Sequence, residues 1–104
     1  MATRVPLYFN SGDDETRTFQ YLNGSTPVNI TGYTAAWSAY VGDQTVSVVG
    51  SVDGVNGKVN VFVSHVQTTA LSTGGSDGFY EVIITSSGGL ITTIAEGPLT
   101  FLTP

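Results

Sequence analysis

The sequence contains no cysteine and a single histidine, His65, among its 104 residues. Without cysteine no disulfide stabilises the fold, and the redox state of the surroundings plays no part in it. A zinc site needs several cysteine or histidine ligands, so this composition excludes one. A catalytic histidine needs a nucleophile and an orienting partner, and no G-x-S-x-G motif accompanies this one. We therefore expect His65 to be solvated or to cap a turn.

Charge is also scarce, because charged residues make up 11% of the chain against about 25% in ordinary soluble domains. Three basic and eight acidic residues give a net charge of −5, which disfavours a nucleic-acid partner. Arg4, Arg17 and Lys58 are too scattered to follow a phosphate backbone. A weakly charged, strand-rich surface is a solubility hazard for a free monomer, but it suits a protein that is packed in an assembly.

Long apolar runs are absent as well. No segment approaches the ~20 residues that span a bilayer. The stretch after Arg4 is too short for the apolar part of a signal peptide, and Pro6 interrupts it. We expect synthesis in a cytoplasm and no membrane partner. A chain of this length predicts one domain over residues 1–104 with a single core.

The second half of the chain shows strands bounded by glycine turns. Apolar and polar residues alternate there over 58–63, 79–85, 90–96 and 99–102, with a break expected at Gly97-Pro98. Further strands are predicted over 5–10, 16–21, 34–40 and 45–52, with an extended segment over 27–30. The only helical candidate is 64–71, capped by Ser64. The pattern predicts an all-β, immunoglobulin-like β-sandwich of seven to eight short antiparallel strands with one short helical turn.

The alternation also separates two faces in the second half. It sends one set of residues into the core: Val59, Val61, Val63, Tyr80, Val82 and Ile84. It sends Phe62, Phe79 and Ile83 outward. Apolar residues on both faces indicate either a covering loop or an exposed interface, and both interpretations stay open at this point.

The acidic residues do not form a recognisable metal site or catalytic pair. Asp13, Asp14 and Glu15 form one cluster, but calcium needs six to eight oxygens around one point and the EF-hand spacing is missing. A solvated turn, or protection of the adjacent sheet edge, is the favoured interpretation. Most other carboxylates lie in turn dipeptides, where aspartate serves the backbone. We expect no enzymatic activity, no cofactor and no metal.

Aromatic residues supply an alternative function. Trp37, with Tyr33 and Tyr40 nearby, could form a platform on which sugars stack. The competing interpretation places Trp37 in the core between the small residues Ala35 and Ala39. Under that interpretation Tyr33 and Tyr40, near the ends of the strand, are the candidates for surface contacts.

Several segments, taken in order, resemble a known group. They are 28–35 (VNITGYTA), 57–63 (GKVNVFV) with 69–71 (TAL), and the closing stretch from Gly78 to Phe101. These resemble the small immunoglobulin-like domains of tailed-phage structural proteins related to the N-terminal domain of the phage baseplate upper protein. The resemblance implies a virion component without catalytic residues. It would dock onto other phage proteins at the capsid, neck, tail or baseplate.

The sequence therefore predicts a non-enzymatic bacteriophage structural protein, located in the virion. Its partners would be other virion proteins, with self-association left open. Phe62, Phe79 and Ile83 are the candidate anchors of the contact. The alternative is a carbohydrate-binding module for host adhesion, which would use Tyr33 and Tyr40.

Overall fold

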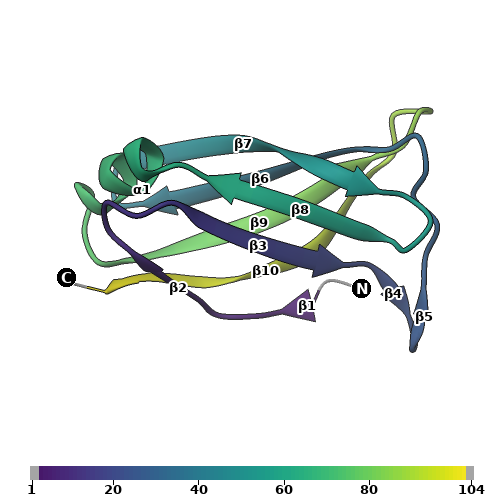
Figure 1. Cartoon of the computed structure of the whole chain (residues 1–104), viewed down its shortest axis with the longest axis horizontal. Helices are drawn as coiled ribbons and strands as arrows, with labels where there is room; N and C mark the ends of the chain where they lie inside the picture. Colours follow the sequence, from purple (N-terminus) through teal and green to yellow (C-terminus); the bar gives the residue numbers. More distant parts are fainter. Residues whose placement is uncertain (1–2, 103–104) are drawn as a thin grey trace.

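The computed structural model describes residues 3–102, which form a curled β-sheet in two layers with one short helix (Figure 1). The strands are β1 (Thr3–Arg4), β2 (Leu7–Asn10), β3 (Glu15–Gln20), β4 (Leu22–Asn23), β5 (Thr26–Pro27), β6 (Thr34–Val41), β7 (Gln44–Asp53), β8 (Lys58–Val63), β9 (Asp77–Thr85) and β10 (Ile91–Leu102), and the helix α1 (His65–Ser72) lies between β8 and β9. The predicted all-β sandwich is confirmed.

The layers share one long strand. The hydrogen-bonded order is β1-β10-β9-β6-β7-β8-β3, and β2 also pairs with β10. β7 pairs with β6 over residues 44–50 and with β8 over residues 51–53. We call β1, β2, β10, β9, β6 and the first part of β7 the large sheet, and the rest of β7 with β8 and β3 the small sheet. A Cβ at Gly50 would lie 2.6 Å from Val59 Cγ1, so glycine permits the close approach where β7 changes layers.

The core lies between the layers. The residues predicted to point inward are all buried: Val59, Val61, Val63, Tyr80, Val82 and Ile84. Trp37 is fully buried and stacks on Phe9 and Tyr80, with ring centroids 5.8 and 6.3 Å away. The core position predicted for Trp37 is confirmed, and this residue cannot serve as a platform for sugars.

Two details of the predicted sheet are wrong. Not all strands are antiparallel, since β1 and β2 run parallel to β10 at the edge. β10 also continues through Gly97 and Pro98 without a break. Backbone N–H groups alternate in direction along a strand, and the N–H of Phe101 donates to Ser76 on the β9 side. The nitrogen of Pro98 therefore faces the gap between β1 and β2, where proline removes no hydrogen bond of the ladder.

Tyr80 holds the chain at this gap. The Val5 N–H donates to the Glu96 carbonyl over 3.0 Å, so in a regular parallel ladder the Val5 carbonyl would accept from residue 98. Proline has no N–H to give. The hydroxyl of Tyr80 donates to the Val5 carbonyl instead, over 2.6 Å. A side chain thus satisfies the backbone acceptor that Pro98 leaves unpaired.

We expect stability to fall at high pH because of Tyr80. Burial, and secondly the negative charge of Glu96, raise the pKa of Tyr80 from 10 to about 12. The folded state favours the neutral phenol, so its contribution is complete below pH 10 and is lost as the pH rises through about 12. Melting temperatures from pH 8 to 12 should show this fall, and Tyr80→Phe should reduce it. An equal fall in both proteins would contradict the prediction.

Helix α1 confirms the predicted helical segment and its cap. The Ser64 hydroxyl accepts from the Gln67 N–H, and the Gln67 side chain accepts from the Ser64 N–H, which is a capping box. The helix has eight residues, and within residues 3–102 no helix is long and apolar enough to cross a membrane.

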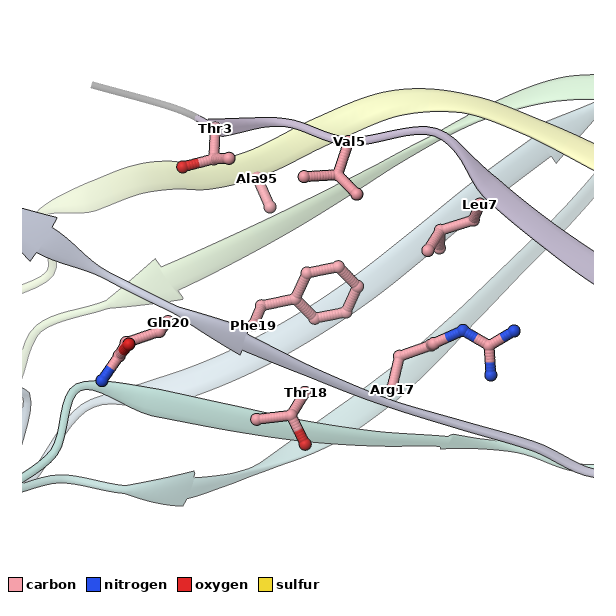
Figure 2. A pocket seen from close by; sticks show the side chains of 8 residues that line it. All are labelled: Thr3, Val5, Leu7, Arg17, Thr18, Phe19, Gln20 and Ala95. Carbon is pink, nitrogen blue, oxygen red and sulfur yellow. The ribbon is translucent and has the colours of Figure 1, made fainter.

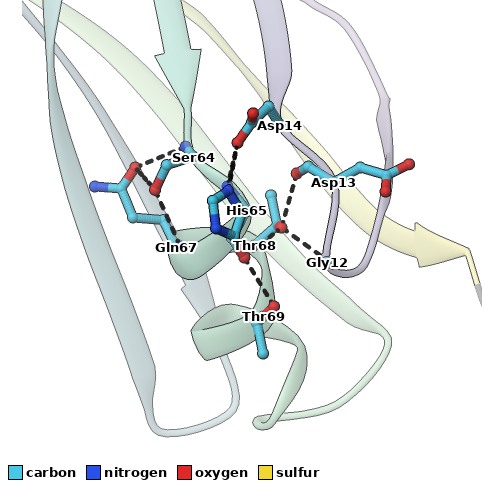
Figure 3. A network of polar contacts seen from close by, with 8 residues as sticks. All are labelled: Gly12, Asp13, Asp14, Ser64, His65, Gln67, Thr68 and Thr69. Atoms are coloured by element: carbon cyan, nitrogen blue, oxygen red, sulfur yellow. Dashed lines mark hydrogen bonds and ion pairs between the residues drawn. The ribbon is translucent and has the colours of Figure 1, made fainter.

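Thr68 fastens this helix to the loop between β2 and β3 (Figure 3). Its hydroxyl accepts from the Gly12 N–H over 3.2 Å. The same hydroxyl lies 2.9 Å from the Asp13 carbonyl and 3.1 Å from the His65 carbonyl, to which it can donate. Thr68 itself is fully buried, so its hydroxyl joins the helix to the loop from beneath the surface.

Replacing Thr68 with valine should lower the free energy of unfolding by about 1–3 kcal/mol, because the buried hydroxyl that joins the Gly12 N–H and the Asp13 carbonyl to the helix is lost. Thr69→Val is the matched control. The Thr69 hydroxyl donates only to the His65 carbonyl, and the residue is exposed, so its replacement should cost under about 0.5 kcal/mol. Urea denaturation measures both values. Equal losses would show that the loop does not depend on Thr68.

Candidate functional site

The outer face of the large sheet carries the largest group of exposed aromatic side chains. Tyr40 on β6 lies opposite Phe79 on β9, which in turn lies opposite Pro98 on β10. Tyr8 on β2 projects from the same face, since its neighbours Leu7 and Phe9 point into the core. We call Tyr8, Tyr40, Phe79 and Pro98 the aromatic patch. It crosses four neighbouring strands near one end of the sheet.

Two rings of the patch are stacked on each other. The centroids of Tyr40 and Phe79 are 6.2 Å apart with 21° between the ring planes. Both residues are 39% exposed, so one side of the stack is covered by the sheet and the other faces solvent. The Tyr40 hydroxyl donates to Glu81 over 3.4 Å. The stack restricts both rings before any partner arrives, and restricting side chains in advance lowers the entropy cost of binding.

A second apolar row crosses the same face further along the strands. Ala36 on β6 lies opposite Val49 on β7 and Ile83 on β9. Val49 is 84% exposed and Ile83 is partly buried. We call these three residues the aliphatic row.

A polar row separates the two apolar groups. It contains Ser47, Ser38, Glu81 and Glu96, in register across four strands. The hydroxyls of Ser38 and Ser47 are 2.9 Å apart and hydrogen-bonded. Glu81 and Glu96 lie directly opposite each other, and like charges in this position are destabilising. The face is therefore apolar at two places and negatively charged between them.

The structure brings together only some of the predicted anchors. Phe79, Ile83 and Tyr40 share the outer face of the large sheet. Phe62 projects from the small sheet instead, opposite Thr16, and is 53% exposed. Tyr33 is partly buried and packs against the core. Because Phe62 lies on the other layer, one flat partner surface cannot contact it together with Phe79 and Ile83.

The acidic cluster forms local contacts. Asp14 accepts from the backbone N–H of His65 and lies 3.0 Å from its Nδ1 (Figure 3). The backbone hydrogen bond, and then the side-chain hydrogen bond, hold the pKa of Asp14 below its usual value. Glu15 accepts from the Asn10 N–H and pairs with Arg17. Among the residues described, no three His, Cys, Asp or Glu side chains gather as a metal site.

The comparisons with known proteins concern the fold. No protein-family model matches the sequence, and no curated protein matches it either. Among solved structures, the N-terminal domain of phage TP901-1 ORF48 has a TM-score of 0.55 at 16% identity, covering 95% of this chain and 82% of that chain. The chain shares its fold with a phage protein domain. The resemblance drawn from the sequence is thus confirmed at the level of the fold.

A second solved structure is a Bacteroides vulgatus protein provisionally described as a glycoside hydrolase. Its TM-score is 0.49 at 14% identity, and the match covers 98% of this chain but 16% of that chain. The similarity therefore concerns a small part of a much longer protein.

Four apolar residues of the outer face escape the sequence analysis. Ala36 could have been found, because it lies between the inward-pointing Ala35 and Trp37. Val49 and Tyr8 could have been found, because each lies between two inward-pointing residues of a predicted strand. Pro98 could not, since Gly97-Pro98 predicts a turn, and only the pairing of β10 with β9 places Pro98 beside Phe79.

Proposed function

We propose that this protein is a non-enzymatic structural component of a tailed-bacteriophage particle, and that it docks onto another particle protein through the outer face of the large sheet. The fold that this chain shares with a phage protein domain supports the proposed role in a phage particle. The single observation that carries the docking surface is the stacked, half-exposed pair of Tyr40 and Phe79.

The composition of this face resembles that of protein interfaces. Aromatic residues are enriched at the energetic centres of interfaces, and charged residues are depleted there. The aromatic patch offers three aromatic rings and a proline on adjacent strands, and its backbone is rigid because it belongs to a hydrogen-bonded sheet. Burying these side chains would remove apolar surface from water without disturbing the fold.

The charge of the face indicates what the partner carries. Glu81 and Glu96 lie side by side with like charge, and Arg4 on β1 is in register with Glu96. Arg4 offsets one of the two carboxylates, so one negative charge remains on this row. A lysine or arginine of the partner, placed over Glu81, would balance it. We infer a partner surface that is apolar with a basic residue near its centre.

Particle incorporation tests this function. In a phage genome that carries the gene, Tyr40→Ser with Phe79→Ser should reduce the copies found in purified particles at least about tenfold, because central aromatic residues dominate binding energy. Quantitative mass spectrometry of the particles measures this. The copy number of the unmodified protein also separates a capsid location, with hundreds of copies, from a neck, tail or baseplate location.

Phe62→Ser is the matched control, because it removes an exposed aromatic side chain from the other layer. It should leave incorporation near the wild-type level. Circular dichroism of each purified variant checks that the fold is retained. Absence of the unmodified protein from particles would refute the virion role. Loss of incorporation by Phe62→Ser alone would place the docking surface on the small sheet.

A further inference from the structure

A groove lies where the ring of hydrogen-bonded strands stays open. β1 and β3 stand at the two ends of the strand order and do not pair with each other. Between them is a cavity of about 360 Å³ (Figure 2). Four apolar residues line it, namely Val5, Leu7, Phe19 and Ala95. The other four lining residues are polar, namely Thr3, Arg17, Thr18 and Gln20. The gap therefore has an apolar floor between two strand edges.

The β3 edge offers backbone groups to this groove. The Tyr21 N–H donates to the Gly57 carbonyl beyond the end of β8, so odd-numbered residues of β3 direct their N–H and carbonyl groups toward β8. Thr18 and Gln20 then direct theirs the opposite way, and both residues line the groove. Residues two apart with free donors and acceptors are what an added strand pairs with.

The opposite edge offers fewer such groups. Val5 donates its N–H to Glu96 on β10 and its carbonyl accepts from Tyr80, and Pro6 has no N–H. By the same alternation, Arg4 is the residue of β1 whose N–H and carbonyl face the groove. This side of the groove contributes the side chains of Val5 and Leu7 instead. An incoming segment would therefore pair with β3 and pack its apolar side chains against the β1–β2 side.

The charge of the groove favours a partner other than this chain. Arg17 is the one charged residue of the lining. It stands 4.9 Å from the centre of the Phe9 ring, contacts Glu15 and donates to the carbonyls of Thr16 and Tyr8. A guanidinium has five N–H donors, so further donors are available for a carboxylate. A second copy of this chain, with net charge −5, would be repelled.

We propose that this groove accepts an extended segment of another protein, in which apolar and polar residues alternate and one carboxylate reaches Arg17. The segment adds a strand to β3 and covers the apolar floor of the groove. This binding mode uses a different surface from the aromatic patch and does not depend on the virion role.

A synthetic peptide tests the groove. The probe has about seven residues, alternates valine with threonine, and carries one aspartate. Titrated into the ¹⁵N-labelled protein, it should bind saturably with a dissociation constant on the order of 0.1 mM. The amides of Thr18 and Gln20 should shift and become protected from exchange. Asparagine in place of aspartate should weaken binding about threefold, as expected for a partly exposed ion pair.

Two further peptides isolate the backbone contribution without changing the protein. In one peptide the backbone nitrogens of the valines are methylated, which removes their N–H groups. In the other peptide the backbone nitrogens of the threonines are methylated. Because N–H groups alternate along a strand, one set faces β3 and the other faces away, so one peptide should lose binding about tenfold more than the other. Equal binding by all three peptides would refute strand addition, and so would the absence of any shift at Thr18 and Gln20.

Two variants of the protein test the same backbone hydrogen bonds by changing the N–H of Thr18. Thr18→Pro removes the N–H that faces the groove and spares the ladder to β8, which is the edge position proline tolerates. Thr18→Val keeps the N–H. Peptide binding should survive in Thr18→Val and disappear in Thr18→Pro. Concentration-dependent dimers that occupy the groove would refute a foreign partner and indicate a second copy of the chain.

Discussion

Replacing Trp37 with alanine is expected to lower the free energy of unfolding by about 3–5 kcal/mol, the usual cost of deleting a large aromatic side chain from a core. Trp37 is fully buried and lies between Phe9 and Tyr80 in a stack that crosses the core. Its removal leaves both rings without a neighbour and opens a cavity that β-strands cannot close, because their spacing is set by backbone hydrogen bonds.

Two variants calibrate this loss in urea denaturation. The indole N–H of Trp37 is buried without a hydrogen-bond partner among the described residues, so Trp37→Phe removes an unpaired donor as well as volume. It should cost less, about 1–2 kcal/mol. Phe62→Ala removes an aromatic residue that is half exposed and should cost under about 1.5 kcal/mol. A Trp37→Ala loss no larger than that of Phe62→Ala would contradict the central position of Trp37.

Replacing Gly97 with valine is expected to cost about 3 kcal/mol, the upper part of the range for overpacking. A Cβ on Gly97 would collide with the carbonyl of Val5, which passes directly over it. Backbone cannot rotate away as a side chain can. The edge segment must then leave β10, and the hydrogen bonds from Val5 to Glu96 and from Tyr80 to Val5 are lost together.

Gly88→Val is the control for Gly97→Val. The Cβ position at Gly88 has only the Ser86 hydroxyl nearby, at 3.8 Å, so the change should stay within about 0.5 kcal/mol. Hydrogen exchange at the Val5 amide should accelerate strongly in Gly97→Val and not in Gly88→Val. Unchanged protection of Val5 in Gly97→Val would show that the edge segment is not held at this position.

Alternation along each strand could be predicted because it depends only on neighbours in the chain. The inward valines of β8, the inward Tyr80 and the buried Trp37 all follow from the two-residue period of an extended backbone. The cap of α1 was also predictable, since Ser64 and Gln67 are three residues apart. Signals of this kind need no knowledge of what packs on the strand.

The candidate site was harder to predict. The sequence placed Phe62, Phe79 and Ile83 outward, but it could not show that Phe62 belongs to a different layer, because layer membership depends on the bend of β7 at Gly50. It also treated Gly97-Pro98 as a turn. Local propensity favours that interpretation, and only the gap between β1 and β2 makes an unbroken strand possible there.

By itself, then, the sequence determined the all-β class, the faces of the strands and the absence of chemistry that needs cysteine or several histidines. Tertiary structure alone decided which outward residues meet. It placed Tyr40 beside Phe79, separated Phe62 from both, and left β1 and β3 unpaired around a groove. The physical reason is that side-chain direction follows from the local backbone, whereas strand order follows from how distant segments bury one common core.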